Sequence, residues 1–226
     1  MVTIKINNYE RFFEVKSMPF LVASIFYNCY KNMKVCLINK NDEVSVYLDS
    51  YETKITRQKG YRIFSSSILF YLYRAGFNSF LNRADLDFQN LTKLTNIKIG
   101  DKEKFFDLIE TFFKYYRKTE FFYTEKAYSI KTPSKKLLKN LESLSSLKSR
   151  GRILLNSIFL GSNCYIEVFL QKLSSQNNIP ISTQRNLSFE EIISGNFNVS
   201  ENFIKDYVLL YRDGKILASI NDVGIE

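Results

Sequence analysis

Residues 105–116 read FFDLIETFFKYY, and their apolar positions return every three or four residues. The repeating positions are Phe105, Leu108, Ile109, Phe112, Phe113 and Tyr116. Because an α-helix turns once in 3.6 residues, this spacing predicts a long helix with one apolar face. Asp101 is a suitable N-cap for it, since a carboxylate can accept hydrogen bonds from backbone N–H groups of the first turn.

Further helical patterns lie on both sides of this stretch. Leucines at 137, 138, 141, 144 and 147 form a second stripe, and residues 153–173 predict a third long helix. Earlier in the chain, helices are expected over residues 20–32 and from residue 65 to about residue 81. Ser188 and Glu191 fit a capping box, and Gly195 is placed to end that short helix.

Two stretches carry β-hairpin signals. In the first, residues 35–38 and 44–48 are strand-like, and residues 39–42 between them are turn-like. In the second, apolar residues 207–211 and 216–220 flank an Asp-Gly pair, which suits a tight turn. The predicted fold is mainly α, within the α+β class, with two separate hairpins near residues 34–48 and at the C-terminus. Its expected division is a helical domain over residues 1–206 and a hairpin over residues 207–226 that forms a docking junction.

The composition predicts a basic globular protein. Of its 226 residues, 45% are hydrophobic and 15% aromatic, which is enough to fill a core. The 32 Lys and Arg exceed the 23 Asp and Glu, giving a net charge of +9 that could attract phosphate backbones or anionic lipids. The basic residues are spread along the chain, however, and an AT-rich genome alone would enrich lysine.

The cysteines and the apolar stretches of the sequence indicate the cellular compartment of the protein. The three cysteines are odd in number and share no metal-ligand spacing, so buried free thiols in a reducing compartment are expected. The N-terminus has no apolar core of signal-peptide kind, and the longest apolar stretches are too short to span a bilayer. A cytoplasmic protein with no membrane partner is therefore predicted.

Catalytic signals are few. The chain has no histidine, which excludes Ser-His-Asp and Cys-His catalysis and histidine metal ligation. No glycine-rich nucleotide loop is present, and the acidic pairs have the spacing of solvated helix faces. We therefore assign no catalytic, cofactor-binding or metal-binding residue, and expect no catalytic activity from the isolated chain. A hydrolase that uses Cys164 is a third possibility, although no base partner can be named for it.

Rings and cations alternate over residues 112–118, as they do on surfaces that bind single-stranded nucleic acid. The same pattern also fits a core stripe with a basic outer edge. Under the nucleic-acid reading, the candidate contacts are Tyr115, Arg117, Lys148, Arg150 and Arg152.

Several segments, taken in order, resemble the helical region that precedes the swivelling domain in phosphoenolpyruvate-utilising enzymes of the phosphoenolpyruvate synthase type. The segments are ERFFEVKSMPFLVAS, VCLINKNDEVSVYLD, KFFDLIETFFKYYRKTEFFYTEKA, KSRGRILLNSIFLGSNCYIEVFLQKL, NIPISTQRNLSFEEIISG and YVLLYRDGKI. The last three, which are consecutive, carry most of the resemblance. The nucleotide-binding segment, the phosphorylated histidine and the phosphoenolpyruvate barrel of that family have no counterpart here.

The resemblance implies a non-catalytic helical module or subunit that scaffolds a separately encoded swivelling-domain protein. Such a partner would dock at the terminal hairpin, where an edge strand can accept another strand. The candidate docking residues are Tyr207, Leu209, Tyr211, Ile216 and Ile220. The alternative hypothesis is a small basic nucleic-acid-binding protein.

Overall fold

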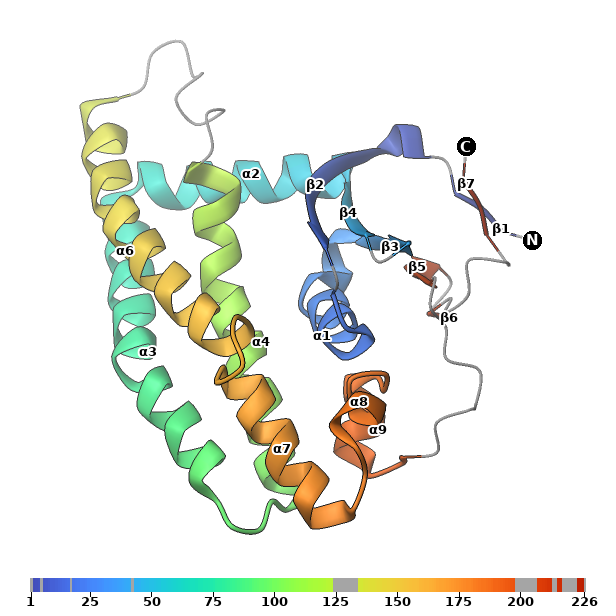
Figure 1. Cartoon of the computed structure of the whole chain (residues 1–226). Helices are drawn as coiled ribbons and strands as arrows, with labels where there is room; N and C mark the ends of the chain where they lie inside the picture. The colour runs from blue at the N-terminus through green and yellow to red at the C-terminus, as the bar shows by residue number, and fades with distance from the viewer. Residues whose placement is uncertain are drawn as a thin grey trace. The chain divides into compact units, whose positions relative to one another are not determined.

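A computed structural model describes residues 2–4, 6–16, 18–41, 43–123, 134–197, 207–212, 215–216 and 223–225 (Figure 1). The chain divides into two compact units. The sheet unit comprises residues 1–54 and 178–226, and the helical unit comprises residues 55–177. We describe each unit by itself.

Long helices build the helical unit. They are α2 (Ser50–Ser65), which begins in the sheet unit, α3 (Ser67–Lys93), α4 (Ile99–Tyr123), α6 (Lys135–Phe159) and α7 (Tyr165–Asn177). Helices α3, α4 and α6 pack against one another, and α7 packs against α3 and α6. Their core is rich in phenylalanine, as in the stacked rings of Phe105 and Phe169, whose centroids lie 4.1 Å apart. Such aromatic pairs contribute stability beyond the area that they bury.

The predicted helices of this unit are confirmed in part. Residues 105–116 lie within α4. Asp101 is not the N-cap, because α4 begins at Ile99; from the first turn its carboxylate accepts a hydrogen bond from the N–H of Lys98, the residue before the helix, at 2.9 Å. The single helix predicted over residues 153–173 is wrong, because α6 ends at Phe159 and α7 starts at Tyr165. Gly161 between them has a φ of 93°, a left-handed conformation that an α-helix cannot contain.

The sheet unit holds an antiparallel sheet with strand order β2-β4-β3-β5-β6. Its strands are β2 (Tyr9–Lys16), β3 (Cys36–Lys40), β4 (Glu43–Asp49), β5 (Tyr207–Arg212) and β6 (Lys215–Ile216). A separate parallel pair joins β1 (Val2–Ile4) to β7 (Val223–Ile225). The helical elements of the unit are α1 (Phe20–Tyr30), α8 (Ile181–Gln184), α9 (Phe189–Ser194) and the 3₁₀ turns Ile6–Asn8 and Lys31–Met33.

The mainly α class and both hairpins are confirmed, since β3 pairs with β4 and β5 pairs with β6. The Asp-Gly turn of the second hairpin and residues 217–220 of its predicted second strand lie outside the described residues. The two hairpins are not separate, however, because β3 also pairs with β5, with Leu37 opposite Leu209. For the same reason the terminal strands belong to one unit with the N-terminal strands, and the expected boundary at residue 207 is not where the units divide.

A polar network ties α9 to α1 within the sheet unit. The Ser24 hydroxyl donates to the Leu21 carbonyl and accepts from the Phe189 N–H at 3.0 Å. The predicted capping box is present, because the Ser188 N–H donates to the Glu191 carboxylate and the Glu191 N–H donates to the Ser188 hydroxyl. Gly195 ends α9 with a φ of 73°, as predicted.

Candidate nucleic-acid interface

The charge of the protein is divided unequally between the two units. The helical unit carries 21 Lys and Arg against 10 Asp and Glu, a net charge of +11. The sheet unit carries 11 against 13, a net charge of −2. The surplus that appears scattered along the sequence is therefore the property of one folded unit, and that concentration favours a polyanionic ligand.

Two polar stripes run along α3 and α6 in the helical unit. The stripe on each helix repeats at steps of three and four residues, so its members share one side of the helix. The stripes consist of Tyr71, Arg74, Asn78 and Asn82 on α3, and of Lys139, Ser143, Ser146 and Arg150 on α6. We call these eight residues the α3–α6 seam.

Arg150 shows that the two stripes face one another. Its Nη1 donates to the Asn78 Oδ1 at 2.6 Å, and its Nη2 donates to the Asn82 Oδ1 at 2.7 Å. Both acceptors are neutral amides, so the guanidinium is positioned without being neutralised. A guanidinium has five N–H donors, and those not directed at the amides can reach a phosphate.

Few acidic groups lie near the seam. Residues 53–84 contain no Asp or Glu but six Lys or Arg. Asp85, the next acidic residue on α3, accepts from the Tyr165 hydroxyl at 2.5 Å and from the Gln89 side chain at 2.9 Å. On α6, Glu142 is exposed at the edge of the seam, three positions after Lys139 and four before Ser146. With Arg74, Lys139 and Arg150 against this one carboxylate, the seam is a net cationic strip, and Asp85 marks its C-terminal end on α3.

Tyr115 does not face solvent freely, in contrast to its predicted role as a nucleic-acid contact. Its ring is stacked on Phe77, with centroids 5.3 Å apart and an interplanar angle of 6°. Its backbone carbonyl accepts from the Tyr73 hydroxyl at 3.0 Å. Lys118 lies over the Tyr73 ring, and burial, with help from the Arg117 charge, lowers its pKa. This cluster is part of the packing between α3 and α4.

The other predicted nucleic-acid contacts are not gathered at one place. Arg150 belongs to the seam, whereas Lys148 and Arg152 each lie two positions away, about 200° around α6. Arg152 is exposed and Lys148 is half-buried. Arg117 is half-buried on α4. The sequence patterns did not identify Arg74, Asn78 and Lys139 as candidate contacts. Their helical spacing can be read from the sequence, but their proximity depends on which helices pack together.

The predicted docking residues lie in the sheet unit. Tyr207 and Leu209 are buried, at 2% and 1% exposure, and the Tyr207 hydroxyl donates to the Met18 carbonyl. These two side chains are therefore not accessible to a partner, and β5 itself lies between β3 and β6 in the sheet. Tyr211 and Ile216 are paired in β5 and β6, and the structure does not describe their side chains. Ile220 lies outside the described residues.

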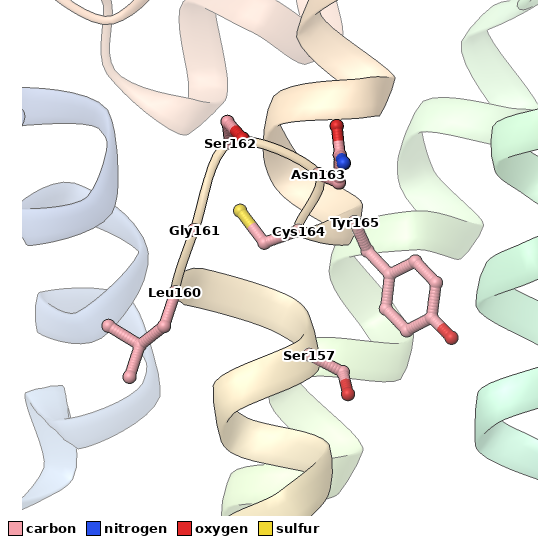
Figure 2. Close-up of a pocket in the computed structure, with 7 residues that line it drawn as sticks. All are labelled: Ser157, Leu160, Gly161, Ser162, Asn163, Cys164 and Tyr165. Carbon is pink, nitrogen blue, oxygen red and sulfur yellow. The ribbon is translucent and has the colours of Figure 1, made fainter.

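A pocket of about 380 Å³ lies at the loop between α6 and α7 (Figure 2). Cys164 and Tyr165 line it together with Ser157 and residues 160–163. Burial raises the pKa of the Cys164 thiol, although backbone N–H groups of the first turn of α7 act in the opposite direction. A raised pKa keeps the thiol protonated near neutral pH, which does not favour its use as a nucleophile.

Within the described ranges, no cluster of three or more Cys, Asp or Glu side chains could hold a metal ion. The helices of those ranges include none that is long and apolar enough to cross a bilayer. No family model, curated protein or solved structure matches the chain.

Proposed function

We propose that this protein binds nucleic acid through its helical unit, with the α3–α6 seam as the contact surface. The observation that carries the proposal is Arg150, a charged guanidinium held between two neutral amides at the C-terminal end of a cationic strip. The net charge of +11 on this unit supplies the long-range attraction.

The chemistry is electrostatic. Arg74, Lys139 and Arg150 are exposed, so they can replace counterions along a phosphate backbone. Asn78 and Asn82 hold the Arg150 side chain in one position, which reduces the entropy that it would lose on binding. The exposed hydroxyl of Ser146 is a further donor to phosphate oxygens on the same strip.

The test is the salt dependence of oligonucleotide binding, followed by fluorescence anisotropy between about 50 and 200 mM salt. Arg150→Gln should weaken binding about 10-fold at low salt and reduce the slope of log affinity against log salt by about 1. Arg152→Gln is the matched control, since it removes the same charge from the other side of α6 and should have a smaller effect. Equal effects of the two variants, or no binding at low salt, would contradict the proposed interface.

A second candidate function is the scaffold implied by the family resemblance. The observation that favours it is that the three consecutive segments with most of the resemblance correspond to α6 with α7, to α8 with α9, and to β5. The scaffold would hold a separately encoded swivelling-domain protein, and the isolated chain would be inactive. Steady ATP hydrolysis by the purified chain, abolished by a point mutation within it, would count against this function.

A further inference from the structure

The first two turns of α3 expose large apolar side chains. Ile68 is 73% exposed, Tyr71 is 69% exposed and Leu72 is 61% exposed, and Leu69 beside them is 40% exposed. Single exposed apolar residues are ordinary, but four of them within five positions indicate a contact surface. We call Ile68, Leu69, Tyr71 and Leu72 the α3 tip.

Exposed cations lie on the elements that meet near the α3 tip. The Asn140 side chain donates to the Phe64 carbonyl at 2.7 Å, which brings the start of α6 to the corner where α2 meets α3. Lys136 and Lys139, four positions and one position before Asn140 on α6, are exposed. Arg62 on α2 and Arg74 on α3 are exposed as well. Tyr71 belongs both to the α3 tip and to the seam, so the apolar surface continues into the cationic strip.

We infer that the ligand of the seam is single-stranded, with one or more bases stacked on Tyr71 at the α3 tip and the following phosphates directed along the seam to Arg150. This inference rests on the proposed function and identifies the class of nucleic acid. Aromatic rings bind the faces of unpaired bases, and every base offers such a face, so binding of this kind tolerates many sequences.

The packing of the helices argues against a duplex ligand. A major groove is about 12 Å wide and admits one helix. Helices α3 and α6 pack side by side, and helices in such contact have axes about 10 Å apart. Together they form a surface that is too broad to enter the groove, so they could contact a duplex only along its phosphates. A duplex also hides the base faces that an exposed ring would contact.

The distribution of charge favours a linear polyanion over a bilayer surface as the ligand. A protein that inserts an apolar tip into anionic lipid needs cations only beside that tip, and the α3 tip has such cations. Here the cationic strip continues from Tyr71 to the level of Asn82, a distance of about 16 Å along α3. A linear polyanion matches a strip of that length.

The experiment compares a labelled oligothymidylate with a duplex of the same length, by anisotropy at one low salt concentration. The variants are Tyr71→Ala and Tyr71→Phe, with Tyr51→Ala as the matched control. Tyr51 is 67% exposed at the start of α2, outside the seam and the α3 tip. Circular dichroism verifies that each variant is folded. Binding to vesicles of phosphatidylserine and phosphatidylcholine is measured in parallel, to test whether the protein binds anionic lipid instead.

We expect the single strand to bind more tightly than the duplex. Tyr71→Ala should weaken single-strand binding roughly 10-fold, while Tyr71→Phe and Tyr51→Ala remain within about twofold of the unmodified protein. Tighter duplex binding, or an unchanged affinity in Tyr71→Ala while Arg150→Gln still weakens binding, would overturn the inference and leave the proposed function standing. Binding to the vesicles without binding to either nucleic acid would overturn both.

Discussion

Gly151 of α6 lies against the ring of Tyr116 of α4, so that a Cβ atom on residue 151 would come within 2.5 Å of the ring Cδ2. Tyr116 is buried at 3% exposure and is stacked on Phe112. The ring has no room to withdraw, so the absence of a side chain at residue 151 sets how closely α4 and α6 approach. The position of the seam on α6 depends on this packing.

Gly151→Ala should therefore destabilise the protein by about 1–3 kcal/mol, despite the better helix propensity of alanine. The measurement is the free energy of unfolding from urea titration. Gly100→Ala in α4 is the control, because a Cβ there would meet no atom within 4 Å. Equal stability of the two variants would show that the contact with Tyr116 is not tight.

Asn78→Asp should weaken nucleic-acid binding without loss of the folded state. A carboxylate at residue 78 would accept from the Arg150 guanidinium as the amide does, but it would neutralise the charge of that guanidinium and repel phosphate. We expect a reduction of about 10-fold in affinity at low salt. Asp85→Asn, which removes a negative charge at the end of the seam, should not weaken binding. A weaker complex in Asp85→Asn would contradict the assigned boundary of the seam.

The stability of the protein should fall in alkaline solution. Burial raises the pKa of the Cys36 thiol to about 12, and burial with weaker electrostatic contributions raises that of Tyr9 to about 12. The folded state then holds these protons more tightly than the unfolded chain. Their contribution to stability is complete below about pH 8, where the unfolded thiol begins to ionise, and is lost as the pH rises towards 12.

An experiment can assign the decline of unfolding free energy with pH to Cys36. Between about pH 8 and 9 the unfolded tyrosines are still largely protonated, so the buried thiols of Cys36 and Cys164 should dominate, each with a loss of up to about 1.4 kcal/mol per pH unit. Urea titrations across this range should show a shallower decline in Cys36→Ala than in the unmodified protein. Parallel declines would mean that Cys36 is not the group responsible.

Ser188→Ala should remove one half of the capping box of α9 and cost about 1 kcal/mol of unfolding free energy. Ser188→Asp should retain most of that stability, because a carboxylate also accepts from the Glu191 N–H. Thermal and urea unfolding of both variants distinguish lost capping from a general effect of substitution. A neutral Ser188→Ala variant would show that this cap does not contribute to the sheet unit.

Local patterns in the sequence predict those helices and turns that are determined by residues close together in the chain. The stripe from Phe105 to Tyr116 specifies α4, and the residues Ser188, Glu191 and Gly195 specify both ends of α9. The pairing of β3 with β5 is not predictable in this way, because it joins residues about 170 positions apart. The gap between α6 and α7 is missed because Gly161 interrupts an apolar period that otherwise continues.

The residues of the proposed interface also divide into those that local sequence patterns predict and those that depend on helix packing. The sequence predicts Tyr115 at the surface because Phe112, Phe113 and Tyr116 already define an apolar face of α4. Since α4 contacts both α3 and α6, its buried face is wider than one stripe, and Tyr115 packs against Phe77. Asn78 and Asn82 have no distinctive signal alone, and only the packing of α3 beside α6 gives them a shared partner in Arg150.

Photo-crosslinking tests the central claim most directly. An oligonucleotide that carries iodouracil in place of thymine forms a covalent bond on irradiation with an aromatic ring stacked on it, and mass spectrometry then identifies the bonded residue. Our account predicts a crosslink at Tyr71, reduced by Arg150→Gln and by raised salt. Crosslinks at Tyr51 or elsewhere in the sheet unit, with none at Tyr71, would contradict it.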